Sequence, residues 1–489
     1  MDFRGNNARI KGEVMNKKLI GNTAWYFLGT AISAIIGFIS APILTRVLST
    51  EVYAQYGMIT SFTTLVATFV YLGQDEAFMR YFDRRKEPFW SFFWRCIRLP
   101  LVLCIIILFL LLEPNHIVLS WVFACDIQNK IAILIIAYIA MLVLQRFLML
   151  TARMEERAAN YSLSNIATKV AFFVALYVFY FMDQIITLTE LVAALMVGVL
   201  CAIAINLVVV VKVKHGANPE GEDITSKELF SFGIPFAISS TMFWVVPLLE
   251  KIIIRDLTNW TVLAIYTSAA IFVTAMGLIK TTVNSIWVPY VYKNYTNEVK
   301  FKRIFRQVGI SLCWLCLVIL AGLIVVRRWV VCIFDSAYYD SMLIAPALVC
   351  GACFDLLTCI YSIGINIKKK TQFHVIVPFV QLAISMATLY IGLPRWGLIA
   401  TGISYLLSIA ISRIVQMTIA LHYYGTDGGY GKLAIMLGIY IVVGILSCFV
   451  SNIQFDILCG FLLLVLGTVV AGKDLYAAFA YVLPNRVKE

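Results

Sequence analysis

Basic side chains stand within or at the ends of long apolar stretches at three positions, Arg46, Lys251 and Lys280. A base in such a stretch either extends along its aliphatic stem to the polar boundary of a membrane or faces a wet interior, where it can bind an anion. Both interpretations stay open for Lys280, which has Asn284 one helical turn away. Lysine and arginine bind phosphate, so the functional interpretation of these three residues is a phosphate site.

Polar residues also form stripes along the first, second and eighth apolar stretches when each is read at 100° per residue. The candidate binding residues on these stripes are Asn22, Tyr26, Tyr56, Tyr266, Lys280 and Asn284. Lipid cannot satisfy their hydrogen bonds, so the stripes face either a neighbouring helix or a wet cavity. A cavity with cations and tyrosines suits a phosphate that carries sugars, whereas an exporter of organic cations would need carboxylates there.

Motifs of catalysis and of metal binding are missing from the sequence. The phrase GGYGKL at 428–433 has the wrong glycine spacing for a nucleotide-binding loop. The four histidines are scattered, and the C-x-x-C pairs Cys313/Cys316 and Cys350/Cys353 lie in apolar stretches, where small packing residues are the simpler interpretation. We therefore expect a protein that is not an enzyme, with no cofactor, no metal and no nucleic-acid partner.

The elements that position these residues are set by the apolar stretches themselves. The chain is 61% hydrophobic and only 13% charged, and a membrane-spanning helix needs about 20 mostly apolar residues. This predicts an all-α polytopic membrane protein with about fourteen spans. They are expected at 19–48, 52–73, 89–113, 131–151, 160–181, 189–211, 229–254, 261–285, 306–333, 341–365, 372–392, 397–421, 432–450 and 456–472. The stretch 114–130 between two of them is expected to be re-entrant or interfacial, because Asp126 and Lys130 would be costly in lipid.

Lysine and arginine in the loops are distributed very unevenly. With the N-terminus in the cytoplasm, the inner segments hold most of them, for example Arg84, Arg85 and Lys86, and the outer segments hold few. This asymmetry predicts that both termini are cytoplasmic, which requires an even number of spans. Twelve would be the alternative if the last two stretches were not spans.

An internal repeat relates the first and seventh stretches. Pro42 precedes Arg46 by four residues, and Pro247 precedes Lys251 by the same interval. Six spans separate the copies, and an even spacing gives a parallel repeat. We expect two six-helix lobes around a central cavity, 1–214 and 215–425, followed by two trailing helices and a cytoplasmic tail in 426–489.

Several phrases resemble the Wzx-type polysaccharide and O-antigen flippases of the multidrug/oligosaccharidyl-lipid/polysaccharide exporter superfamily. They include KKLIGNTAWYFLGTAISAIIGFISAPILTRVLSTEVYAQYGMITS (17–61), FSFGIPFAISSTMFWVVPLLEKIII (230–254) and GLIATGISYLLSIAISRIVQ (397–416). The resemblance implies alternating access in a bacterial inner membrane and flipping of an undecaprenyl-diphosphate-linked oligosaccharide. It also implies Arg46, Lys251 and Lys280 as contacts of the diphosphate. A polysaccharide polymerase with chain-length machinery is the implied protein partner.

Three alternatives remain at the level of sequence. A flippase of lipid II would share the fold, and the bound lipid distinguishes it. A drug/cation antiporter is disfavoured by the basic candidates. A membrane glycosyltransferase or polymerase would need a large outer loop with catalytic acids.

Overall fold

The structure is a computed structural model that describes most of the chain. The described residues are 25, 28–29, 31–113, 116–124, 127–183, 185–213, 221–294, 298–368, 370, 372–425 and 428–482. Two candidate binding residues, Asn22 and Tyr26, lie outside them.

Secondary structure in the described ranges is helical apart from one isolated bridge between Arg85 and Glu222. Twelve helices there are long and apolar enough to cross a membrane. The helix Ala31–Val47 and the bent pair Thr50–Tyr71 and Gln74–Tyr81 coincide with the first two expected spans. The all-α polytopic architecture is therefore confirmed. In its described residues, the stretch after the third span contains one short helix, α5 (Ile117–Phe123).

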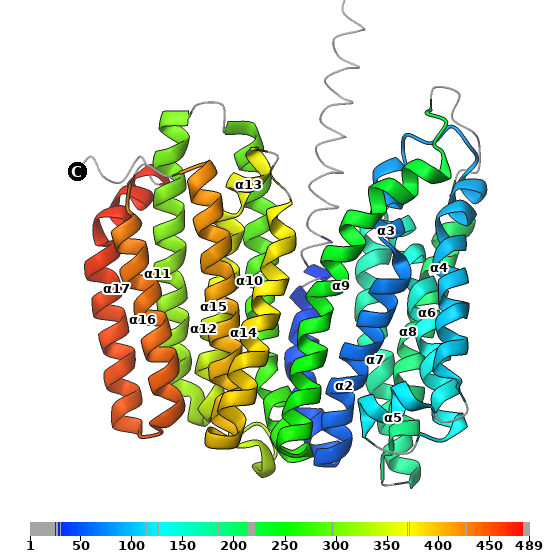
Figure 1. The fold of residues 1–489 in the computed structure, drawn as a ribbon, viewed down its shortest axis with the longest axis horizontal. Helices are drawn as coiled ribbons and strands as arrows, with labels where there is room; N and C mark the ends of the chain where they lie inside the picture. Colours follow the sequence, from blue (N-terminus) through cyan, green and yellow to red (C-terminus); the bar gives the residue numbers. More distant parts are fainter. Residues whose placement is uncertain are drawn as a thin grey trace, which may run out of the picture. The chain divides into compact units, whose positions relative to one another are not determined.

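Contacts along the chain divide it into two compact units. Unit 1 comprises Met1–Ile39 and Gln55–Val245, and unit 2 comprises Ser40–Ala54 and Val246–Glu489. The helices of unit 1 include most of α2 (Thr50–Tyr71), then α3 (Gln74–Tyr81), α4 (Phe89–Leu111), α5, α6 (Asn129–Met154), α7 (Ala158–Asp183), α8 (Leu188–Val211) and the first part of α9 (Ser226–Leu257). Within unit 1, α8 packs against both α6 and α7 (Figure 1).

The chain turns sharply between α2 and α3, whose axes differ by 55°. Leu72 and Gly73 both have positive φ, at 46° and 67°. A β-carbon on Gly73 would lie only 2.0 Å from the carbonyl oxygen of Gly233 in α9. Only glycine fits this close approach, which holds the break in the second span against α9.

The segment before α9 is also fixed to unit 1. The Glu222 amide donates to the Arg84 carbonyl at 2.6 Å, and the Lys86 amide donates to the Glu222 carbonyl at 3.1 Å. Arg80 stacks over the ring of Phe232 with its guanidinium carbon 4.3 Å from the centroid. These contacts attach the first part of α9 to unit 1. The expected lobe boundaries stay a prediction.

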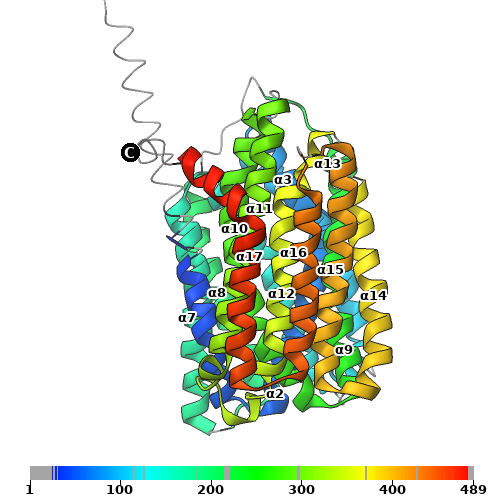
Figure 2. The ribbon, with the colours of Figure 1, turned by 90° about the vertical axis from the view of Figure 1, so that its left-hand side faces the viewer.

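Unit 2 is built around α12 (Ser341–Tyr361), which is almost completely buried. The other helices of this unit are α10 (Trp260–Asn294), α11 (Glu298–Val331), η1 (Ser336–Tyr338), α13 (Ile363–Ile367), α14 (Phe373–Trp396), α15 (Leu398–Tyr423), α16 (Tyr430–Phe449) and α17 (Ile453–Val482). Helices α10, α11, α15 and α16 all pack against α12, and α14 packs on α15 (Figures 1 and 2). A polar side chain on α12 must therefore find its partners on these neighbours.

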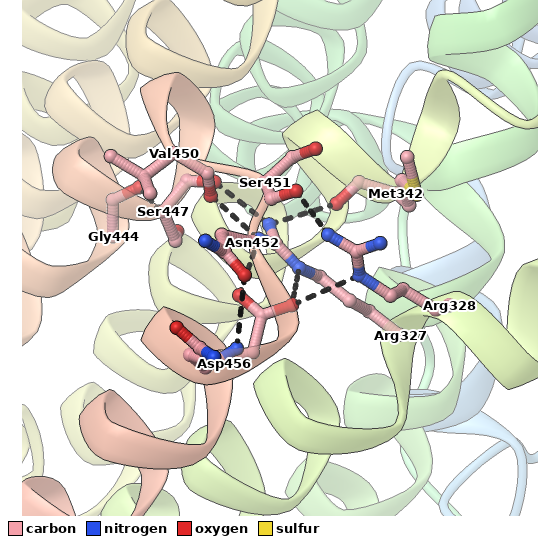
Figure 3. A network of polar contacts seen from close by, with 10 residues as sticks. Arg327, Arg328, Met342, Gly444, Ser447, Val450, Ser451, Asn452 and Asp456 are labelled. Atoms are coloured by element: carbon pink, nitrogen blue, oxygen red, sulfur yellow. Dashed lines mark hydrogen bonds and ion pairs between the residues drawn. The ribbon is translucent and has the colours of Figure 1, made fainter.

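The trailing helices α16 and α17 lie against α11, and a buried ion pair fixes them at one end (Figure 3). Arg327 of α11 is 0% exposed and donates to both oxygens of Asp456, at 2.6 and 3.1 Å. The same guanidinium donates to the carbonyls of Ser447 and Val450, both at 2.7 Å. At the other end of these helices, Lys432 and Arg306 approach Asp474 at 2.5 and 3.6 Å. The two trailing helices are thus an integral part of unit 2.

We predict that Arg327→Met strongly destabilises the protein, by about 3–5 kcal/mol, because it leaves the Asp456 carboxylate buried without its main partner. Arg328→Met is the matched control, since Arg328 reaches the same carboxylate at 3.5 Å from a partly exposed position. Thermal unfolding in detergent, monitored through the reactivity of the buried cysteines, gives the unfolding midpoint of each variant. Equal midpoints for the two variants would show that the ion pair does not hold the trailing helices.

Candidate functional site

Three charged side chains from three helices meet inside unit 2. Asp355 of α12 accepts from the Lys280 ammonium of α10, and its other oxygen lies 2.8 Å from Nη2 of Arg413 in α15. The side chains are 23% (Asp355), 32% (Lys280) and 11% (Arg413) exposed. Two cationic groups thus share one carboxylate, which leaves an excess of positive charge between membrane-spanning helices.

The cluster continues as a chain of hydrogen bonds toward α13. Nη1 of Arg413 donates to Oε1 of Gln416 at 3.2 Å. Nε2 of Gln416 donates to Nδ1 of His374 at 2.9 Å, and Nε2 of His374 donates to Oδ1 of Asn366 at 2.9 Å. One assignment of donors satisfies all three bonds, with neutral His374 protonated on Nε2. The chain orients the Arg413 guanidinium from the side opposite Asp355.

The exposed polar face of α10 lies next to Lys280. Thr274, Thr281, Asn284 and Ser285 are exposed, and a β-carbon on Gly277 would have no neighbour within 4 Å. Their spacing places them on one side of the helix, with Lys280 at its edge. Ile286, which is 70% exposed, lies on the opposite side. A polar exposed face is poorly suited to acyl chains, so this side of α10 is the natural boundary of a wet space.

A buried carboxylate forms a second polar centre in unit 2. Glu250 of α9 is 4% exposed. It accepts from the Tyr266 hydroxyl at 3.2 Å and from the Ser385 hydroxyl at 2.6 Å. Lys251 follows it directly in the chain and is half-buried. Tyr266 is therefore turned toward Glu250, in a closely packed part of the bundle.

The other sequence candidates lie elsewhere. Nη2 of Arg46 donates to the carbonyl of Ile333, just beyond the end of α11, at 2.9 Å. Phe272 of α10 contacts the neighbouring Phe334, with 6.4 Å between ring centroids. Lys280 is eight residues further along α10, or about 12 Å at the helical rise. Arg46 and Lys280 therefore lie at different depths.

Tyr56 belongs to unit 1, where its ring stacks on Phe172 at 5.9 Å. The side chain of Tyr56 is partly exposed.

Sequence reasoning did not select Arg413. The signal was available, because an arginine between Ile411 and Ile414 is costly in lipid and needs a buried partner. Asp355 is that partner. Its two basic neighbours are 75 and 58 residues away along the chain, so spacing alone could not join them.

Comparisons with known proteins add the family and the fold. The model of a family described as polysaccharide biosynthesis protein matches residues 19–295. No curated protein sequence matches the chain.

Solved structures of transporters share the fold at low identity. The lipid II flippase MurJ, in an inward closed conformation, is 14% identical with a TM-score of 0.69, over 92% of this chain and 99% of that one. An inward-facing multidrug resistance MATE family transporter of the MOP superfamily is 12% identical with a TM-score of 0.63, over 81% and 96%. A MOP superfamily transporter from Pyrococcus furiosus is 13% identical with a TM-score of 0.52, over 83% and 95%. The fold expected from the sequence resemblance is thus confirmed.

We predict that cysteines introduced at Thr281 or Asn284 react with a charged, membrane-impermeant thiol reagent at least about tenfold faster than one at Ile286, because thiolates form in water and not in lipid. The background should have Cys332 replaced, since it is exposed. Labelling rates in membranes give the comparison. Equally slow labelling at all three positions would show that the polar face of α10 is dry.

Proposed function

Because the chain belongs to the polysaccharide biosynthesis protein family, we propose that it is a flippase for an undecaprenyl-diphosphate-linked oligosaccharide repeat unit. It would move this lipid across the bacterial cytoplasmic membrane for the synthesis of a surface polysaccharide such as O antigen or capsule. The family and the matched folds are those of transporters and flippases, and the chain is a multi-pass membrane protein. Both termini would lie in the cytoplasm, and the polymerase with its chain-length machinery would receive the product.

The observation that carries this proposal is the excess of positive charge around Asp355. A lipid diphosphate is a mobile anion, and lysine and arginine are its usual protein ligands. Lys280 and Arg413 provide both kinds of donor at the border of an exposed polar face. Asn284 on that face is available for hydrogen bonds to the sugars.

The remaining candidates have supporting roles in the proposal. Arg46 and Lys251 would meet the diphosphate at other depths during translocation. Tyr56 would border the sugar path, together with Asn22 and Tyr26 of the first span. Tyr266 would support the path from behind, through its hydrogen bond to Glu250. Transport would proceed by alternating access, as is common for repeat transporters.

Transport of lipid II is the second candidate function. It is favoured by the similarity in fold to a lipid II flippase over 92% of this chain. Both cargoes would use the same cationic cluster, and the chemical identity of the accumulated lipid distinguishes them.

The first test is genetic. We predict that Lys280→Ala abolishes surface polysaccharide, with at least about a tenfold loss, because one of two phosphate-binding cations is removed. Complete lipid-linked repeat units should build up on the cytoplasmic side, as in a strain that lacks the gene. Lys280→Arg, which keeps the charge, should retain most of the activity. Extraction and mass spectrometry of the lipid-linked intermediates give the measurement.

Several results would contradict the proposal. Normal surface polymer in the deletion strain argues against flipping of the repeat unit. Accumulated lipid II would assign the other cargo. A Lys280→Ala strain whose dye resistance changes while its polymer does not would point to an antiporter, and formation of new glycosidic bonds by the purified protein would point to an enzyme.

A further inference from the structure

We propose that Asp355 is an internal counter-anion that takes the place of the substrate phosphate whenever the carrier is empty. The inference rests on the proposed function, because it assumes an anionic lipid as the cargo. It assigns Asp355 a role in the return of the empty carrier, which binding studies of the loaded state would not detect.

The first step of the argument is the cost of unpaired charge. Arg413 is only 11% exposed and Lys280 is 32% exposed, and both lie on membrane-spanning helices. Two cations at such a position without a partner are strongly unfavourable, because their lost hydration is not replaced. Asp355 lowers that penalty by contacting both at once. The empty carrier therefore depends on Asp355, while a loaded carrier has the phosphates of its cargo.

The second step is that donors remain available at the cluster. Nε of Arg413 is buried and has no hydrogen-bond partner among the described residues. The Lys280 ammonium has three N–H donors, and Asp355 is its described ion-pair partner. An entering phosphate can thus form its first hydrogen bonds to these donors before the ion pairs of Asp355 break.

The third step is competition for the same donors. A phosphate binds guanidinium best through two parallel hydrogen bonds, and one of the Arg413 donors required already points at Asp355. Full engagement of the cargo therefore displaces the carboxylate. The displaced Asp355 then repels the bound anion, which limits affinity and promotes release after translocation.

This mechanism separates two activities of one transporter. Net flipping requires the empty carrier to reorient, whereas exchange of one lipid for another uses only loaded carriers. An Asp355→Asn variant should bind the cargo more tightly, but its empty form should reorient more slowly across the membrane. It should lose net flipping to a much greater extent than exchange.

Proteoliposomes that contain a fluorescent polyprenyl diphosphate bearing one sugar provide the test. The labelled lipid is first placed alone in one leaflet, at many lipid molecules per protein. The decrease of fluorescence from that leaflet then reports net flipping. With unlabelled lipid added to both leaflets, the same signal reports exchange. For Asp355→Asn we expect affinity to rise about tenfold, exchange to slow because release slows, and the ratio of net flipping to exchange to fall at least about tenfold below the wild-type ratio.

Two variants act as controls. Asp355→Glu keeps the carboxylate and should keep net flipping. Arg413→Gln leaves a neutral pair of Lys280 and Asp355, so affinity should fall while the ratio of net flipping to exchange stays at the wild-type value. The cargo lipid should also raise the thermal midpoint of Asp355→Asn more than that of the wild type, because it restores the missing anion.

The outcomes separate this inference from the proposed function. If the wild type neither binds nor moves the lipid, the flippase proposal fails and the role of Asp355 fails with it. If the wild type does both and Asp355→Asn keeps the wild-type ratio, only the role of Asp355 is overturned. A fall of that ratio in Arg413→Gln overturns it as well, and this variant gives an answer even if Asp355→Asn does not fold.

Discussion

The constraint on which this structure depends is that a bilayer cannot solvate charge. Each ionisable side chain placed among the spans must find its partner on another helix. Arg146 of α6 meets Asp75 of α3 at 2.8 Å, Arg327 meets Asp456 at 2.6 Å, and Asp355 meets Lys280 and Arg413. These pairs join elements that are distant in the chain and thereby specify which helices pack together. The apolar surfaces alone would leave many arrangements nearly equal in energy.

The ion pairs differ in a way that separates structure from function. Arg327 is completely enclosed, and its donors are used by one carboxylate and by backbone carbonyls. It is saturated and has nothing to offer a ligand. The cluster at Asp355 has more cations than carboxylates, an unused buried donor on Arg413 and partial exposure. A charge that is incompletely compensated within a membrane raises the free energy of the folded protein. Such an unfavourable arrangement is typical of a site that a bound ligand completes.

Much of the fold could be predicted from the sequence because a span is a local property. About 20 apolar residues suffice to define one, and every expected stretch coincides with a helix in the described ranges. The site was harder to predict from the sequence. A helical wheel shows on which face of a helix a residue lies, but not its depth in the membrane or the residue that it contacts on another helix. Tyr266 lies on the expected polar stripe but packs on Glu250, and Arg46 lies at another depth from Lys280. The helical wheel places Lys280 beside the polar face of α10, whereas its link to Arg413 through Asp355 depends on the packing of α10, α12 and α15.

The same physics explains how one fold can accept unlike cargoes. This chain shares its architecture with a lipid II flippase at 14% identity and with a multidrug transporter at 12%. Helix packing therefore tolerates nearly complete replacement of side chains, provided that the spans stay apolar and their charges stay paired. Cargo selection then depends on the few charges left incompletely paired. A bundle with surplus carboxylate would attract cations, and one with surplus lysine and arginine attracts anions. In unit 2 the surplus at Asp355 is one positive charge, so replacing Lys280 by an acid would reverse the sign of the cluster, and we expect the preferred cargo to change with it.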